Sequence, residues 1–302
     1  MDQRYRVIRA IQAGYHAQLM DLAEVRRIAI IAMFADDYLL DRVVLKGGNA
    51  LSLVYRIGTR TSLDLDFSIE ADFPDSDEAR ERIFRALRAR FDSAGYVVFD
   101  ETFGPRPAVQ RPGQSPRWGG YSVEFKLIDR GRFDELHRDV DALRRQSLVV
   151  GPAQVRIFTI DLSRYEYCEP KREMELDNFI IYVYTPEMIA IEKVRAICQQ
   201  MPEYPLIVHH RPRARDFYDI ALIVKECKVS FATQENQQLV RDIFAAKEVP
   251  LSLIGQIASY REFHRADWPK VEQAVAEQLL PFDDYFDFVL AETAKLQPLW
   301  KE

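Results

Sequence analysis

The sequence has little cysteine, no long hydrophobic run and no excess of positive charge. Its cysteines, Cys168, Cys198 and Cys227, are too few and too scattered for the disulfide framework of a small secreted domain. The longest apolar run covers only residues 28–35, whereas a membrane-spanning helix needs about 20 apolar residues. The N-terminal residues also have no apolar core like that of a secretory signal. These absences predict a cytoplasmic protein with reduced thiols and no contact with a membrane.

The charge and size of the chain narrow the class of protein further. Lys and Arg number 41 against 47 Asp and Glu, which gives a net charge of −6. This balance argues against a protein that binds nucleic acid over its whole surface, but it allows a local basic site. A hydrophobic content of 48% is typical of a folded globular protein, and 302 residues correspond to about two domains.

The pattern of apolar residues changes at Thr185. Before this residue, helical periodicity alternates with short apolar runs, which predict strands at 43–45, 62–69, 96–99, 121–128, 154–162 and 176–184. After it, the pattern is helical almost throughout, and we expect Thr185 to cap the first of these helices with Pro186 in its first turn. The sequence therefore predicts an α+β protein, with an α/β domain over 1–185 that starts with a helical segment and a helical domain over 186–302.

Asp64 and Asp66 lie on one face of the strand predicted at 62–69, because the residues between and around them are apolar. Two carboxylates this close raise each other's pKa unless a cation neutralises them. Mg²⁺ suits this role, since it prefers carboxylate oxygens together with substrate phosphates. The pair therefore predicts a metal site, although the solvent-facing side of an edge strand would show the same alternation.

A glycine motif, Lys46-Gly47-Gly48-Asn49, precedes the acidic pair at the junction of a strand and a helix. Glycines at such a junction let backbone N–H groups approach a phosphate, and the helix N-terminus favours an anion there. We expect Asn49 to begin the helix as its N-cap. Two glycines are also common in a plain tight turn, and the spacing is not that of a P-loop. Together with the acidic pair, the motif predicts a loop that holds a triphosphate beside metal ions.

Three charged residues of the helical half lie at the borders of apolar helix faces. Lys193 borders the stripe of the helix predicted at 186–202, and Asp216 and Asp219 share one border of the helix at 213–227. Charges in such positions either flank the helix in solvent or face a cleft between the domains.

Four motifs in this order carry a family resemblance: L-K-G-G-N-A-L, R-x-S-x-D-x-D-F, E-K-x-R-A and R-D-F-Y-D-I. They span residues 45–220, and their combination resembles the AbiEii/AbiGii-type nucleotidyltransferase toxins, a group that includes the MenT toxins. This group belongs to the DNA polymerase β-like superfamily. The resemblance implies a nucleotidyltransferase core with a mixed sheet, an all-helical C-terminal domain and an active site between them.

The resemblance also assigns roles to residues of this chain. It implies a nucleotide-binding loop at Lys46, Gly47, Gly48 and Asn49. Beside this loop it implies a serine, Ser62, and two metal-binding acids, Asp64 and Asp66. In the helical half it implies a lysine on the nucleotide phosphates, Lys193, and a catalytic-site aspartate, Asp216, with Asp219 as its companion. Asn49 departs from the family pattern, which more often has Ser or Thr. Many superfamily members use a third acid on a neighbouring strand, and Glu124 in the strand at 121–128 is the candidate, unless it simply faces solvent.

The function that the resemblance implies is transfer of a nucleoside monophosphate from an NTP to an RNA acceptor, with tRNA 3′ ends as the first candidate. Two Mg²⁺ ions would assist this step, and a cognate antitoxin, itself a candidate DNA-binding protein, would control the toxicity. RNA contacts are expected at Arg211–Arg215 or in the arginine-bearing connection at 104–120. Two alternatives stay open: a non-catalytic nucleotide-binding protein, and nucleotidyl transfer to a protein hydroxyl.

Overall fold

A seven-stranded mixed sheet forms the centre of the protein, with the strand order β3-β4-β5-β2-β1-β7-β6. The computed structural model describes residues 20–58, 64–109, 115, 117–150, 154, 156–207, 209–275 and 278–300. The strands are β1 (Val43–Lys46), β2 (Leu65–Ile69), β3 (Tyr96–Arg106), β4 (Gly120–Asp129), β5 (Phe158–Ser163), β6 (Lys171–Leu176) and β7 (Phe179–Tyr184). β2 pairs antiparallel with β1 and parallel with β5. This architecture confirms the predicted α+β class.

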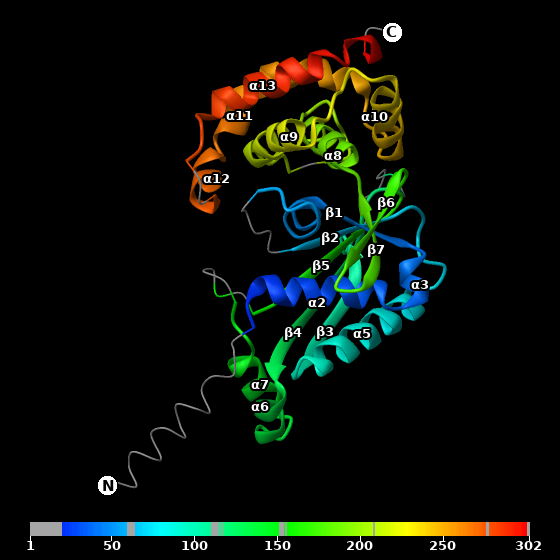
Figure 1. Cartoon of the computed structure of the whole chain (residues 1–302), viewed down its shortest axis with the longest axis vertical. Helices are drawn as coiled ribbons and strands as arrows, with labels where there is room; N and C mark the ends of the chain where they lie inside the picture. The colour runs from blue at the N-terminus through cyan, green and yellow to red at the C-terminus, as the bar shows by residue number, and fades with distance from the viewer. Residues whose placement is uncertain are drawn as a thin grey trace, which may run out of the picture.

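Two helices of the first half cover one face of the sheet, α2 (Leu22–Phe34) and α5 (Ser76–Ser93) (Figure 1). The Phe34 ring of α2 lies 5.9 Å from that of Phe67 on β2, so the apolar residues of β2 face this layer. α5 begins where the Asp75 carboxylate accepts hydrogen bonds from two backbone N–H groups of the first turn. The polar residues of β2 consequently face the opposite side of the sheet. This half also holds the shorter helices α3 (Asp37–Leu40), α6 (Arg130–Glu135) and α7 (Val140–Gln146).

The second half is helical, and its helices gather at one end of the molecule (Figure 1). They are α8 (Pro186–Cys198), α9 (Ala214–Cys227), α10 (Gln234–Ala246), a 3-10 helix (Leu251–Tyr260), α11 (Arg261–Arg265), α12 (Trp268–Ala274) and α13 (Phe282–Ala294). The Thr185 hydroxyl accepts a hydrogen bond of 3.3 Å from the backbone N–H of Met188, which confirms the predicted cap of α8. Within the described residues, no helix combines the length and apolar character that crossing a bilayer requires.

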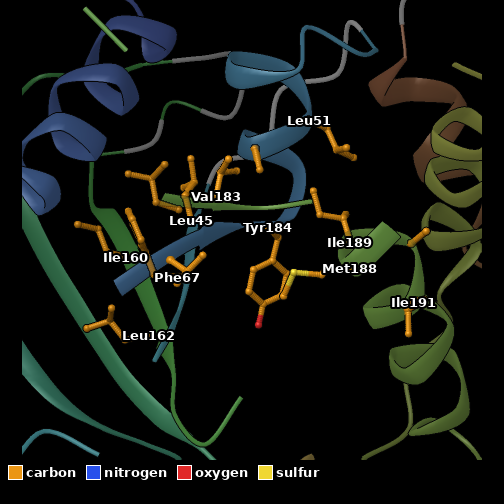
Figure 2. Packing of buried hydrophobic residues seen from close by; sticks show 14 of the residues in the cluster. Leu45, Leu51, Phe67, Ile160, Leu162, Val183, Tyr184, Met188, Ile189 and Ile191 are labelled. Carbon is orange, nitrogen blue, oxygen red and sulfur yellow. The ribbon is translucent and has the colours of Figure 1, made fainter. Parts of the chain in front are cut away.

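The sheet and α8 share one hydrophobic core. Tyr184, the last residue of β7, lies between sheet residues such as Phe67 and Met188 of α8 (Figure 2). Its hydroxyl donates a hydrogen bond of 2.8 Å to the buried Ser68 hydroxyl. Because this core is continuous, α8 is held firmly against the sheet. The division of the chain into two domains at 185/186 stays a prediction.

Several predicted elements have other bounds in the structure. β2 begins at Leu65, and residues 62–63 of the predicted strand lie outside the described residues. β3 continues to Arg106 because it pairs with β4 as far as Gly120, so the predicted connection at 104–120 is shorter. The helix predicted at 132–146 is divided into α6 and α7, since two residues between them have positive φ. The pattern gave no sign of β6, and the helix predicted at 270–296 is two helices, α12 and α13.

Candidate active site

Asp66 stands at the middle of a row of charged residues across three strands. In the register of the sheet it lies opposite Lys46 of β1 on one side and Asp161 of β5 on the other. Residues in register on adjacent strands point to the same face of a sheet. Asp64 lies one residue before β2 and is exposed. The fold therefore brings Asp161 into the neighbourhood of the acidic pair that the sequence predicts.

The electrostatics of the three carboxylates show how close they are. Burial raises the pKa of Asp66 to about 6; Lys46 opposes this shift, while Asp161 and Asp64 add to it. Although the residue is exposed as a whole, desolvation of its carboxyl group and the charge of Asp161 raise the pKa of Asp64. A divalent cation bound beside Asp64 and Asp66 would displace any proton from them, because it supplies the positive charge that the group of acids lacks.

The third acid predicted from the sequence, Glu124, occupies a different place. Glu124 lies on β4 and faces the same side of the sheet as Asp161. Its register partner on β5 is Thr159, however, two residues before Asp161. The Thr102 hydroxyl donates a hydrogen bond of 3.4 Å to its carboxylate. Sequence reasoning missed Asp161, although the alternation of residues 158–163 leaves this aspartate as the single acid on the polar face of the strand. That signal could have identified it.

The glycine motif lies directly against Asp66. Gly47 has φ +69°, and a Cβ atom on it would stand 2.6 Å from Oδ2 of Asp66, so no larger residue fits. Helix α4 (Gly47–Asn49) begins at Gly47 and continues as a π-helical turn over Ala50–Val54. The expectation that Asn49 caps this helix is wrong: the residue lies inside it. Its buried side chain instead donates a hydrogen bond of 2.6 Å to the backbone carbonyl of Asp64, which ties the loop to the start of β2.

Lys46 belongs to a buried ion network. Its ammonium lies 2.5 Å from Glu192 of α8 and 3.4 Å from Glu166, which follows β5. Arg195 and Lys247, also buried, contact Glu166 at 2.8 and 3.5 Å. Burial opposes the charge of Lys46, but the two glutamates prevail and raise its pKa. The predicted nucleotide-binding Lys46 is thus engaged with carboxylates that join β1 to the helical half.

The three charged residues predicted at helix borders meet one another. The Lys193 ammonium of α8 lies 3.0 Å from Asp216 and 2.7 Å from Asp219, both on α9, and all three side chains are largely buried. Arg213, from the predicted basic segment, has its Nε 3.1 Å from Asp216. Lys193 follows Glu192, the partner of Lys46, so this cluster lies directly beside the ion network that joins α8 to the sheet.

Other predicted site residues lie outside these clusters or outside the described residues. Ser62 is not among the described residues. Arg106 of the predicted basic connection lies at the end of β3, and its guanidinium contacts both carboxylate oxygens of Asp161. In the described part of the chain, no three His, Cys, Asp or Glu side chains are grouped closely enough to hold a metal ion. The three carboxylates supply the hard oxygen donors that Mg²⁺ prefers, but Asp161 is directed to Arg106.

Comparisons with known proteins give one family match. The family model described as nucleotidyl transferase AbiEii toxin, type IV toxin–antitoxin system, matches residues 30–292. No curated protein matches the chain. Among solved structures, JHP933 from Helicobacter pylori is 15% identical, with a TM-score of 0.45 and 94% of each chain covered. A putative nucleotidyltransferase from H. pylori is also 15% identical, with a TM-score of 0.46 and coverage of 94% of this chain and 97% of that one. An antigenic nucleotidyltransferase-like protein from Paracoccidioides brasiliensis is 16% identical, with a TM-score of 0.36 and coverage of 74% and 92%.

Proposed function

Because the chain belongs to the AbiEii family of nucleotidyltransferase toxins of type IV toxin–antitoxin systems, we propose that it transfers a nucleoside monophosphate from an NTP to an RNA acceptor, first of all a tRNA 3′ end. The observation that carries the proposal is the row of acids on one sheet face, with Gly47 against Asp66 and Asp161 beside it. Such a row beside a glycine loop at a helix start suits a nucleotide whose phosphates bridge to metal ions.

We assign the metal-binding role to Asp64, Asp66 and Asp161, since their oxygens are the donors that Mg²⁺ selects. Two Mg²⁺ ions held by these residues would supply positive charge to the transferring phosphoryl group and would lower the pKa of the attacking hydroxyl. Gly47 and Gly48 bring backbone N–H groups to the phosphates without side chains in the way. Asn49 supports them indirectly, by fixing this loop to the backbone at Asp64.

We assign a further positive charge in the site to the helical half of the chain. Lys193 is proposed to neutralise phosphate charge during transfer, as positioned cations do in phosphoryl transfer. Asp216 and Asp219 hold its ammonium from two sides, which fixes its place before substrate binds. Arg211–Arg215 span the start of α9 and are proposed as the local contact with RNA, which the net negative charge of the chain restricts to such a spot.

Incubation of the purified protein with each labelled NTP, Mg²⁺ and total tRNA tests this function. Labelled tRNA is expected with at least one NTP, and Asp66→Asn is expected to abolish it. Asp161→Asn should lower the rate by at least about 100-fold, in the range that metal-binding and charge-stabilising groups contribute. Glu124→Gln is the matched comparison on the same sheet face. If Glu124→Gln lowers the rate more than Asp161→Asn does, the third acid is Glu124 and not Asp161. Absence of label with all four NTPs, in wild type and Asp64→Ala alike, contradicts the proposal.

The acceptor and the partner are tested separately. Mass spectrometry that finds the nucleotide on a protein hydroxyl, and none on RNA, would reassign the acceptor class while keeping the nucleotidyl transfer. The family implies an antitoxin partner, and we propose that it is a DNA-binding protein that acts in the cytoplasm with this chain. Rescue of growth by the product of the adjacent reading frame, together with its binding to its own promoter, is the expected result.

A further inference from the structure

Arg106 covers the acids on the side that faces solvent. It is the last residue of β3, and its guanidinium donates to both carboxylate oxygens of Asp161. Its positive charge also lowers the pKa of Asp64, against the effects of burial and of Asp161. The Arg106 side chain is 60% exposed, whereas the Asp161 side chain is 23% exposed. An exposed cation therefore holds a half-buried carboxylate of the candidate metal site.

The backbone of Arg106 is fixed although its side chain is exposed. Arg106 pairs with Gly120 of β4. A Cβ atom on Gly119, which has φ +102°, would stand 2.6 Å from the Arg106 carbonyl oxygen, and one on Gly120 would meet the backbone of Leu162, next to Asp161. These close approaches anchor the start of the side chain beside β5. The guanidinium is consequently the part that can move, at the end of a long flexible stem.

We propose that Arg106 is a positioning residue that holds Asp161 away from metal until the nucleotide arrives, and that its guanidinium then moves to the triphosphate. This inference rests on the proposed function, because it takes Asp161 as a metal ligand. While both oxygens of Asp161 accept from Arg106, the guanidinium charge beside them repels a divalent cation and occupies one side of the carboxylate. This arrangement explains why no three acids among the described residues are grouped around a common point, although Asp66 and Asp161 are in register.

When Arg106 moves from Asp161 to the triphosphate, the hydrogen bonds and the charge contacts that it loses are matched by those that it gains. Nη1 of Arg106 donates to both oxygens of Asp161, and a guanidinium binds phosphate oxygens as readily as carboxylate oxygens, so these hydrogen bonds can be replaced by bonds to the triphosphate. Ion pairs as exposed as this one contribute little stability and are easily broken. The charge is balanced too, since Asp161 exchanges one cation for another. Arg106 therefore makes metal binding depend on nucleotide binding, and the free protein binds metal weakly.

Binding of Mn²⁺ to the full-length protein, followed by electron paramagnetic resonance with and without a non-hydrolysable NTP analogue, tests this coupling. Without nucleotide, Arg106→Ala is expected to bind Mn²⁺ about fivefold more tightly than wild type, because an exposed ion pair no longer competes and a nearby positive charge is gone. With the analogue, the difference should shrink or reverse, because the variant lacks a phosphate contact. Arg88→Ala is the matched control: Arg88 pairs with Glu101 on the same sheet with similar exposure, away from the acids.

Two other results overturn the inference and separate it from the proposed function. If Arg106→Ala binds Mn²⁺ no more tightly than wild type, while Asp66→Asn abolishes binding, then Arg106 merely supports the structure and the metal-dependent function stands. If neither wild type nor variant binds Mn²⁺ even with the analogue, the metal-dependent function and the inference fail together. A charge-retaining variant, Arg106→Lys, should fall between wild type and Arg106→Ala, since lysine keeps the charge but not the fork.

Discussion

Replacing Asp66 by Asn is expected to stabilise the metal-free protein at neutral pH while it abolishes transfer. Burial, with the nearby carboxylates, raises the pKa of Asp66 from 3.8 to about 6. Below pH 3.8 the carboxyl is protonated in both folded and unfolded chains, so it has no effect on stability. As the pH rises through this window, the unfolded chain loses the proton first, and the folded state becomes less stable. A shift of about two units corresponds to about 3 kcal/mol of unfolding free energy, reached above pH 6.

Urea unfolding at pH 5 and pH 8, with a chelator present, measures this effect. The gain in unfolding free energy of Asp66→Asn over wild type should be about 1 to 2 kcal/mol larger at pH 8 than at pH 5, because the folded carboxyl ionises between them. Asp41→Asn, which removes one exposed negative charge at the end of α3, is the matched control. A gain that is equal at both pH values, or a variant less stable than wild type at pH 8, would refute the assignment of a raised pKa to Asp66.

The same variant connects stability to metal binding. Added Mg²⁺ should stabilise the wild-type protein against urea, since a ligand that binds only the folded state shifts the equilibrium towards it. Asp66→Asn should gain little from the ion. Wild type would then be the less stable protein without metal and the better stabilised one with it, which is the expected trade between stability and activity at a functional site.

Three further substitutions test other parts of the site. Gly47→Ala places a Cβ atom 2.6 Å from the Asp66 carboxylate at φ +69°. It should lower the unfolding free energy by about 1 to 2 kcal/mol and remove most of the activity in a transfer assay. Gly104→Ala, at a position with open space around it, should lower both only slightly. Lys193→Met should raise the KM for NTP and lower kcat in steady-state kinetics, because the two aspartates of α9 lose the cation between them. Glu166→Gln removes the charge shared by three buried cations, and in urea unfolding it should lower the unfolding free energy by about 3 to 5 kcal/mol.

The features that sequence reasoning predicted are local ones. The alternation around Asp64 and Asp66 depends on neighbours in the chain, and so does the Thr185 cap of α8, which the structure confirms. Asp161 is different, because its place beside Asp66 depends on the order of strands and on a parallel register between β2 and β5. The alternation of residues 158–163 marks Asp161 as a candidate, but no local pattern places its strand beside β2, and Glu124 shows the same alternation on β4.

Local rules also failed where a distant contact decides the role of a side chain. Asn49 has the chemistry of a helix cap, but Lys46 stands at the cap position, and the amide of Asn49 bonds to the backbone of Asp64. Lys46 has the chemistry of a phosphate ligand, but Glu192 lies 146 residues further along the chain and meets it at 2.5 Å. Both contacts form only when the sheet and α8 are in place, so neither could be predicted from neighbouring residues.

The buried ion network joins the two parts of the proposed active site, which come from different halves of the chain. Lys46 immediately precedes Gly47, and Glu192 immediately precedes Lys193, so the ion pair between Lys46 and Glu192 fixes the glycine loop relative to the lysine proposed for the phosphates. A buried charge pair is a poor source of stability, but it fixes one geometry, because a displaced partner would leave a charge without compensation. In each pair of neighbours, one residue is held in the network and the other is the one that we propose for substrate contact. A change at Glu192 should therefore displace Lys193 without touching it, with the loss appearing in transfer activity before it appears in the fold.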